Sequence, residues 1–307
     1  MNNCFNLKIA ALMFVVFSKV FAQADAKLSS YFFTPMTYNP AYAGSYEGIS
    51  LSGVYSSQWV GFEGAPTTIL FSGHGTFINS HTGMGLDVIN DEIGASKETS
   101  VTGNYSYHFN LNSKWKLAMG IKAGVNSYTL DYNLLAIENP EEYSGSSGTV
   151  NNMSFNFGTG FYLHDDKFFV GLGIPNILAE KNRNDQVYIL SNNNKYYITS
   201  GYKFEIDEYI SLQPTIMTRL SKGESQSTMF ALNSVWSEKF YVSLNFEPSV
   251  SVGSFVGVRF LEKYMIGYSY DASINSFSRY NDGSHSFFVN FRLEDFWKRE
   301  RCSCYSF

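Results

Sequence analysis

The side chains that most often carry out acid–base, nucleophilic or metal chemistry are few in this chain and lie far apart. No two histidines have a spacing that would place both on one face of a strand, as a metal site requires. The five are His74, His81, His108, His164 and His285. Ser286 follows His285 directly, but neighbours in a strand point to opposite faces, so they cannot pair as base and nucleophile. We therefore expect no catalytic residue, metal ligand or bound cofactor.

Acidic residues and glycines also match no catalytic pattern. Adjacent carboxylates such as Asp91-Glu92 and Asp165-Asp166 fall at expected turns, where solvation is the ordinary explanation. No glycine-rich loop precedes a Lys-Ser or Lys-Thr pair, so a phosphate-binding loop is not expected. The net charge of −5 argues against nucleic acid as a partner. An enzyme, for example an outer-membrane hydrolase, is the least favoured class of function.

The first 22 residues have the order of a secretory signal peptide. Lys8 supplies a positive charge, Ile9–Phe17 is a short apolar run, and a small residue, Ala22, precedes Gln23. The apolar run is well short of the ~20 residues that a spanning helix needs, which disfavours the alternative of an uncleaved membrane helix. We expect cleavage after residue 22 and delivery of the mature chain to the bacterial envelope.

Composition narrows the class further. Aromatic residues make up 17% of the chain and charged residues only 16%. Past the signal, no apolar run approaches the length of a membrane-spanning helix. An exported chain of this kind is either a soluble β-rich domain or a β-barrel whose lipid-facing apolar residues alternate with polar residues that face the lumen.

The period of the apolar residues favours the barrel. In Met153–His164, every second residue would face outward: Met153, Phe155, Phe157, Phe161 and Leu163. Trp115–Asn126 alternates in the same way. Such runs reach the ~9–11 residues of a tilted membrane strand, whereas strands of soluble domains are usually about half as long. A large soluble sandwich remains the alternative.

We therefore predict an all-β fold, a transmembrane antiparallel β-barrel of the bacterial outer membrane that spans residues 48–293. About fourteen strands can be traced, an even number, as expected for single-chain bacterial barrels. Short links alternate with long ones, of which the largest are Leu130–Asn152, Asn176–Asn194 and Ser273–Gly283. Short periplasmic turns and longer surface loops are typical of such barrels, so both termini should lie in the periplasm.

Two segments flank the expected barrel. A barrel of this size holds water unless something fills it, and residues 23–47 are rich in aromatic side chains, with Pro35 and Pro40 opposing an extra strand. This segment is either a plug in the lumen or a periplasmic arm. Residues 294–307 form a periplasmic tail that contains Cys302 and Cys304. Inward-facing charges predict a polar lumen: Lys116, Lys122, Arg219, Arg259, Asp271 and Arg292.

Two motifs are rich in Gly, Pro and aromatic residues and bracket the first expected strand. They are N-P-A-Y-A-G at Asn39–Gly44 and Q-W-V-G-F-E-G-A-P-T-T at Gln58–Thr68. Together they resemble the start of the PorP/SprF family of type IX secretion system outer-membrane proteins of Bacteroidetes. The matching positions are Asn39, Pro40, Ala41, Tyr42, Ala43, Gly44, Gln58, Trp59, Gly61, Gly64, Ala65 and Pro66. Ser56 departs from the family, which tends to carry a basic residue there.

The resemblance implies a non-enzymatic outer-membrane barrel of the type IX secretion and gliding-motility machinery. Such a barrel would support export or surface attachment of a large, adhesin-like secreted protein by binding it. The implied partners are the C-terminal domain of that exported cargo at the cell surface, secretion-machine subunits in the periplasm or outer membrane, and membrane lipid. A passive or fatty-acid-type outer-membrane channel is the alternative, and it would need an open lumen.

The second motif suggests where a partner would bind. Gly61, Gly64 and Pro66 confine the first surface loop, and a confined aromatic loop is a plausible binding element. The candidate partner-binding residues are Trp59, Phe62, Glu63 and Pro66. The alternative is a hairpin that packs only against its own barrel mouth.

Overall fold

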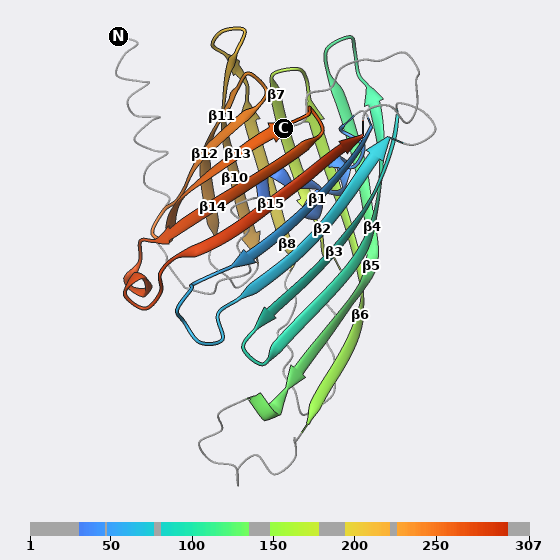
Figure 1. The fold of residues 1–307 in the computed structure, drawn as a ribbon. Helices are drawn as coiled ribbons and strands as arrows, with labels where there is room; N and C mark the ends of the chain where they lie inside the picture. Colours follow the sequence, from blue (N-terminus) through green and yellow to red (C-terminus); the bar gives the residue numbers. More distant parts are fainter. Residues whose placement is uncertain are drawn as a thin grey trace, which may run out of the picture.

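The chain folds into a closed, 14-stranded antiparallel β-barrel, as the alternating pattern predicts (Figure 1). The computed structural model describes residues 31–46, 48–76, 81–134, 148–177, 194–221 and 226–293. The expected signal peptide and the C-terminal tail with Cys302 and Cys304 lie outside the described residues. In the part of the chain that is described, no helix has both the length and the apolar character to cross a membrane.

Each strand pairs with its neighbours in the sequence, and the last strand pairs with the first. The strands are β1 (Ile49–Ser57), β2 (Thr67–Thr76), β3 (Thr82–Ile93), β4 (Ser96–Asn110), β5 (Lys116–Asp131), β6 (Thr149–His164), β7 (Phe168–Ile174), β8 (Lys195–Tyr202), β9 (Phe204–Glu205), β10 (Ile210–Ser221), β11 (Ser227–Trp236), β12 (Phe240–Glu247), β13 (Ser251–Phe260), β14 (Tyr264–Ser273) and β15 (Ser284–Leu293). The two-residue β9 continues β8 past Lys203 and pairs with the same neighbour, β10. Fourteen strands therefore close the ring.

Side chains alternate between the two faces of the wall as predicted. On the outer face of β6, the side chains of Met153 and Phe155 are 67% and 65% exposed. The next residue, Asn156, points into the barrel and is only 7% exposed. This pattern gives the barrel an apolar outer face for lipid and an inner face that carries most of the polar residues.

The links between strands differ at the two ends of the barrel. In the part of the chain that is described, one end carries short turns, among them 237–239 and 261–263. The other end carries the loops that include η4 (Tyr132–Leu134) and η5 (Ser276–Arg279). Strands β5 and β6 are each 16 residues long and reach furthest at the long-loop end (Figure 1). Because short turns face the periplasm in such barrels, we assign the long-loop end to the cell surface.

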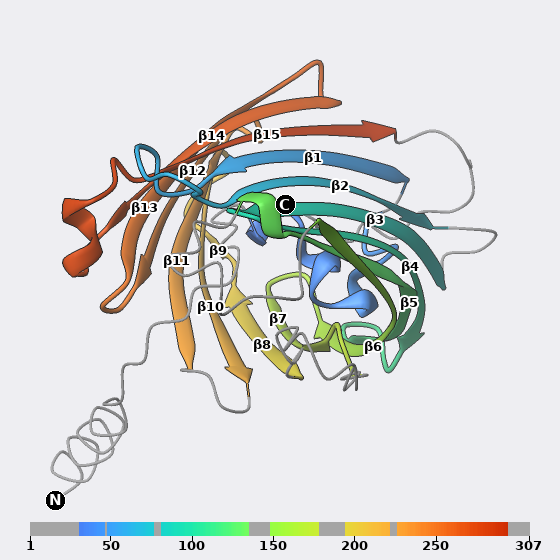
Figure 2. The same ribbon diagram turned by 90° about the horizontal axis from the view of Figure 1, so that it is seen from below.

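Residues 31–46, which we call the inner segment, lie inside the barrel (Figure 2). The segment contains three 3₁₀ turns, η1 (Tyr31–Phe33), η2 (Pro35–Thr37) and η3 (Pro40–Tyr42). Proline starts the last two turns, a position where its missing N–H costs nothing. The Asn39 side chain caps η3 by accepting a hydrogen bond from the Ala41 N–H at 3.1 Å.

Besides buried charges such as Lys122 and Arg259, which the sequence predicts to face inward, the lumen contains apolar side chains. Lumen-facing apolar residues form a cluster at mid-barrel: Val54, Leu70, Tyr241, Phe255, Met265 and Phe288. The Phe33 ring of the inner segment packs onto this cluster, with its centroid 4.2 Å from that of Phe255 and 5.2 Å from that of Phe288. The cluster gives the inner segment an apolar surface to bury against.

The assignment of the two ends can be tested by cysteine labelling on intact cells. In a background carrying Cys302→Ser and Cys304→Ser, we expect Ser278→Cys in η5 to react with a membrane-impermeant maleimide. Glu208→Cys, in a short turn, should react only after the outer membrane is permeabilised, because its turn faces the periplasm. Labelling of position 208 but not 278 on intact cells would mean that the barrel is inserted the other way round.

Candidate functional site

A row of small residues crosses five neighbouring strands on the inner face of the wall. Cα partners in direct register run from β3 to β7 and are Gly83, Ser106, Gly120, Gly160 and Gly173. The inner segment lies along this row, and its turn η3 contacts β4, β5 and β6. The row is therefore a shallow track that admits the backbone of another segment.

The approach of the inner segment is so close that larger side chains would not fit. A Cβ at Gly120 would overlap the backbone of Pro40 and Ala41, and one at Gly160 would overlap the Asn39 side chain. A Cβ at Gly173 would overlap the carbonyl oxygen of Tyr38, and one at Gly83 would overlap that of Ala43. Glycine is needed at these positions because two backbones meet there.

Hydrogen bonds fix the segment on the track. The Asn39 side-chain amide donates to the carbonyl of Phe161 at 3.1 Å. The Ala43 carbonyl accepts from the Ser106 hydroxyl at 2.5 Å and lies 2.9 Å from Nε2 of His108, which donates when that nitrogen carries the proton. Both ends of the Asn39–Ala43 stretch are thus bonded to the wall.

A buried ion pair holds the preceding turn. Lys122 on β5 is 3% exposed, and its ammonium group donates to the Thr37 carbonyl at 2.6 Å and lies 3.3 Å from the Asp87 carboxylate. Asn104 donates a further bond to the same carboxylate at 2.9 Å. Removing either charge would leave the other buried and unpaired, which typically costs about 3–5 kcal/mol.

The inner segment also contacts strands β8 and β15. Its Tyr38 ring lies 5.5 Å from that of Tyr197 on β8, and the Arg292 guanidinium of β15 lies 4.8 Å from the centre of the Tyr46 ring. Burial raises the pKa of Tyr42 to about 12, so this phenol stays neutral at physiological pH. The segment therefore bridges the lumen from β3–β8 to β13 and β15.

At the surface end, the loop between β1 and β2 pairs with the loop between β14 and β15. Val60 donates its N–H to the Gly283 carbonyl and accepts from the Asp282 N–H, both at 2.8 Å. The Phe277 ring lies edge-on to Trp59 and to Phe62, with centroid distances of 5.0 and 5.3 Å. The sequence predicts a confined loop around Trp59 and Phe62 but gives no sign of Phe277, which comes more than 200 residues later.

The candidate partner-binding residues differ in accessibility. Phe62 and Glu63 are exposed and Trp59 is half-buried, whereas Pro66 is buried. Trp59 has a φ of 47°, unusual for a bulky residue, which its pairing with the second loop holds in place. Together with the exposed Tyr280, which packs near Phe277, the loop aromatics form what we call the surface aromatic cluster: Trp59, Phe62, Phe277 and Tyr280.

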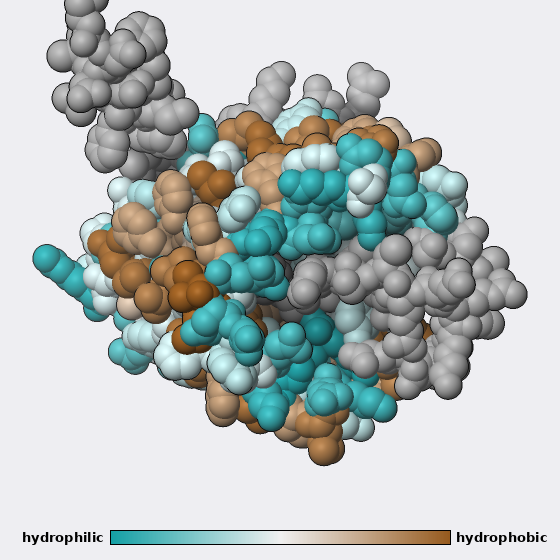
Figure 3. Space-filling view, turned by 90° about the horizontal axis from the view of Figure 1, so that it is seen from above, coloured by the Kyte–Doolittle hydropathy of each residue, from teal (hydrophilic) through white to brown (hydrophobic). Residues whose placement is uncertain are grey.

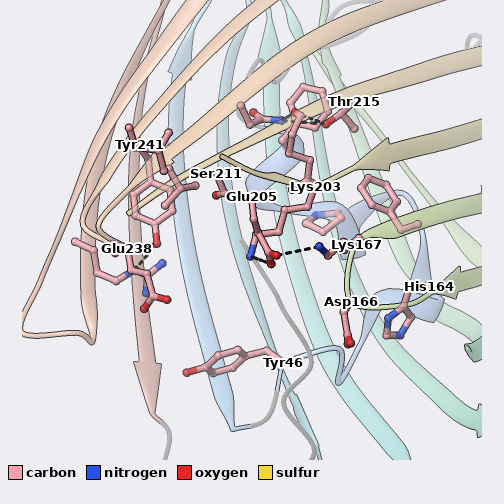
Figure 4. A pocket seen from close by; sticks show the side chains of 18 of the residues that line it. Tyr46, His164, Asp166, Lys167, Lys203, Glu205, Ser211, Thr215, Glu238 and Tyr241 are labelled. Carbon is pink, nitrogen blue, oxygen red and sulfur yellow. Dashed lines mark hydrogen bonds and ion pairs between the residues drawn. The ribbon is translucent and has the colours of Figure 1, made fainter. Parts of the chain in front are cut away.

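The periplasmic end contains a cavity of 1370 Å³ between the inner segment and the short turns, which we call the vestibule. Figure 3 views this end and shows hydrophilic side chains over its centre. In Figure 4, Lys167 faces Glu205, and their charged groups are 3.0 Å apart. This pair is exposed, so it contributes little to stability. Among the described residues, no three His, Cys, Asp or Glu side chains are arranged to hold a metal ion.

A family model described as type IX secretion system membrane protein PorP/SprF matches residues 20–291. The chain belongs to this family. No curated protein matches the chain. The outer membrane protein Omp33 of Acinetobacter baumannii shares the fold, with 10% identity over 81% of this chain and 100% of that one and a TM-score of 0.50. The CymD monoaromatic hydrocarbon channel is 11% identical over 89% of this chain and 95% of its own, with a TM-score of 0.49.

Family and fold identify this PorP/SprF protein as an integral barrel of the outer membrane. Its two family motifs occupy different places. Asn39–Gly44 lies on the track inside the barrel, and Gln58–Pro66 forms the first surface loop. Ser56, the position at which the sequence departs from the resemblance, is buried and accepts a hydrogen bond from Ser286 at 2.9 Å. The two serines thus satisfy each other inside the wall.

A larger side chain on the track should displace the inner segment. We expect Gly120→Val to raise single-channel conductance in planar bilayers and antibiotic uptake by cells, because valine cannot share space with the Pro40–Ala41 backbone. Gly103→Val is the matched control, since a Cβ there meets nothing closer than ordinary van der Waals distance. Heat-modifiable migration on gels would verify that both barrels fold. Equal, low conductance in both variants would show that the track does not hold the segment.

Proposed function

We propose that this protein is a closed, non-enzymatic docking barrel of the type IX secretion system that supports export or surface attachment of a large adhesin-like partner. The observation that carries the proposal is the position of the Asn39–Gly44 motif. The motif that is typical of the family fills the lumen, where it cannot touch a partner at the cell surface. The barrel then acts through its two ends.

The alternative, a passive or fatty-acid-type channel, fits the interior less well. An open pathway would require the inner segment to leave the lumen, which breaks the Lys122–Thr37 and Asn39–Phe161 bonds and exposes the track. It would also expose the Phe33 ring and the apolar cluster beneath it. A closed resting state is therefore the better supported of the two.

At the surface end, the cluster of Trp59, Phe62, Phe277 and Tyr280 has the properties of an anchor for the C-terminal domain of the cargo. Aromatic residues dominate binding hot spots, and the paired backbones of the two loops hold these rings in place before a partner arrives. A preformed site loses little conformational entropy on binding. Glu63, exposed beside the cluster, adds one negative charge to its rim.

At the periplasmic end, the short turns and the vestibule would receive subunits of the secretion machine, while lipid covers the outer apolar face. We propose no catalytic activity and no cofactor. The buried histidines are scattered over the wall, and His108 is already used in holding the inner segment.

Loss of the surface aromatic cluster should release the cargo. With Trp59→Ala and Phe62→Ala together, we expect the exported adhesin-like protein to appear in the medium, since loss of one hot-spot residue typically costs at least about 2 kcal/mol, or roughly 30-fold in affinity. Immunoblots of cells and medium measure the distribution. Phe277→Ala should act in the same direction, because that ring supports both others.

Trp236→Ala with Phe240→Ala is the matched control, because these exposed rings lie at the opposite end of the barrel. The control should retain the cargo on the cell. If the Trp59 and Phe62 variant is folded and inserted, and yet keeps its cargo as the wild type does, the surface cluster is not the anchor.

A further inference from the structure

One cation inside the barrel has no anionic partner. Arg259 on β13 is 6% exposed, donates from Nε to the Tyr241 hydroxyl at 3.0 Å and lies 3.6 Å from the Met265 sulfur. Its Nη1 makes no hydrogen bond, and among the described residues no carboxylate lies within ion-pair distance. Lys122 in the same lumen is paired with Asp87. Burying an unpaired charge destabilises a protein, so a stabilising role does not account for Arg259, whereas a binding role would.

A second arginine stands beside the first. Arg292 on β15 lies over the Tyr46 ring and is close enough to Arg259 for the two charges to repel each other. Both guanidinium groups line the vestibule. The planar fork of the Arg259 guanidinium is suited to a carboxylate, and Arg292 adds a second positive charge to the same wall.

The vestibule is larger than a site for a small ion. Its 1370 Å³ exceeds the roughly 300–1,000 Å³ of most small-molecule pockets. Aromatic and apolar side chains of the inner segment and of the wall line it: Phe32, Pro35, Tyr38, Tyr42, Tyr162 and Phe169. It is bounded by the short turns, so an occupant enters from the periplasm. Size, aromatic lining and position favour a peptide over a free ion.

We propose that the vestibule binds a peptide segment that carries a carboxylate next to an aromatic residue, supplied by a periplasmic partner protein. The carboxylate binds Arg259 and Arg292, and the aromatic side chain packs against the tyrosines of the inner segment. The site itself is argued from these contacts, and only the view that the partner belongs to the secretion machine rests on the proposed function. Binding would also place the peptide against the segment that fills the lumen.

The test uses the purified, folded mature protein in detergent and two matched probes. One is acetyl-Gly-Gly-Phe with a free C-terminal carboxylate, and the other is the same peptide with a C-terminal amide. By calorimetry, we expect saturable binding of the acid and at least tenfold weaker binding of the amide, because the amide cannot form charge-assisted hydrogen bonds with an arginine.

Arg259→Gln should weaken binding of the acid by a similar factor, and Arg259→Lys should fall between it and the wild type, because it keeps the charge without the fork. Arg279→Gln, in η5 at the surface end, is the control and should bind as the wild type does. Without peptide, Arg259→Gln should unfold at the same or a higher temperature, since it removes an unpaired buried charge. Loss of binding is then not a folding defect.

The proposal would be overturned by no binding of the acid, by equal binding of acid and amide, or by unchanged binding to the Arg259→Gln variant. Displacement of the peptide by chloride or phosphate at equal concentration would identify an adventitious ion only, and would equally reject a peptide site. None of these results bears on cargo retention by Trp59 and Phe62 at the other end. Failure of this inference is therefore distinguishable from failure of the proposed function.

Discussion

The close contact between two backbones inside the barrel is the constraint on which the rest of the structure depends. Residues 38–44 of the inner segment lie on a track of one serine and four glycines, and any Cβ at Gly120 or Gly160 would push them away. Such a contact tolerates almost no variation in side-chain size along the track, because packing gaps and overlaps both cost stability. The barrel wall and the segment before it therefore form one packed unit.

This unit separates the two ends of the molecule. The buried Lys122–Asp87 pair and the ring of Phe33 fix the inner segment in the lumen. The loops that carry Trp59 and Phe277 meet at one end of the barrel, and the vestibule opens at the other. A protein with a filled centre can bind different partners at its two ends at once without becoming a pore. That property suits the docking role that we propose for the two ends.

The sequence predicted the fold well because the barrel signal is local. Alternation along Met153–His164 and Trp115–Asn126 assigns each residue to one face without knowledge of any other strand. The track could not be predicted, because successive members lie up to 40 residues apart in the sequence and align only once the strand register is known. For the same reason, the sequence indicated neither the role of Phe277 nor the apolar cluster inside the lumen. The Asn39–Gly44 motif was recognised, but its sequence left open whether it was a plug or an arm.

The most direct test of a filled lumen is the planar-bilayer conductance of the purified mature protein, compared with that of a variant lacking residues 31–46. An empty barrel of this strand number is wide enough to hold a water-filled path. We expect the wild type to be closed and the variant, if it still migrates as a heat-modifiable folded barrel, to form stable open channels. Open channels in the wild type, or the same low conductance in both, would contradict the conclusion that this segment closes the barrel.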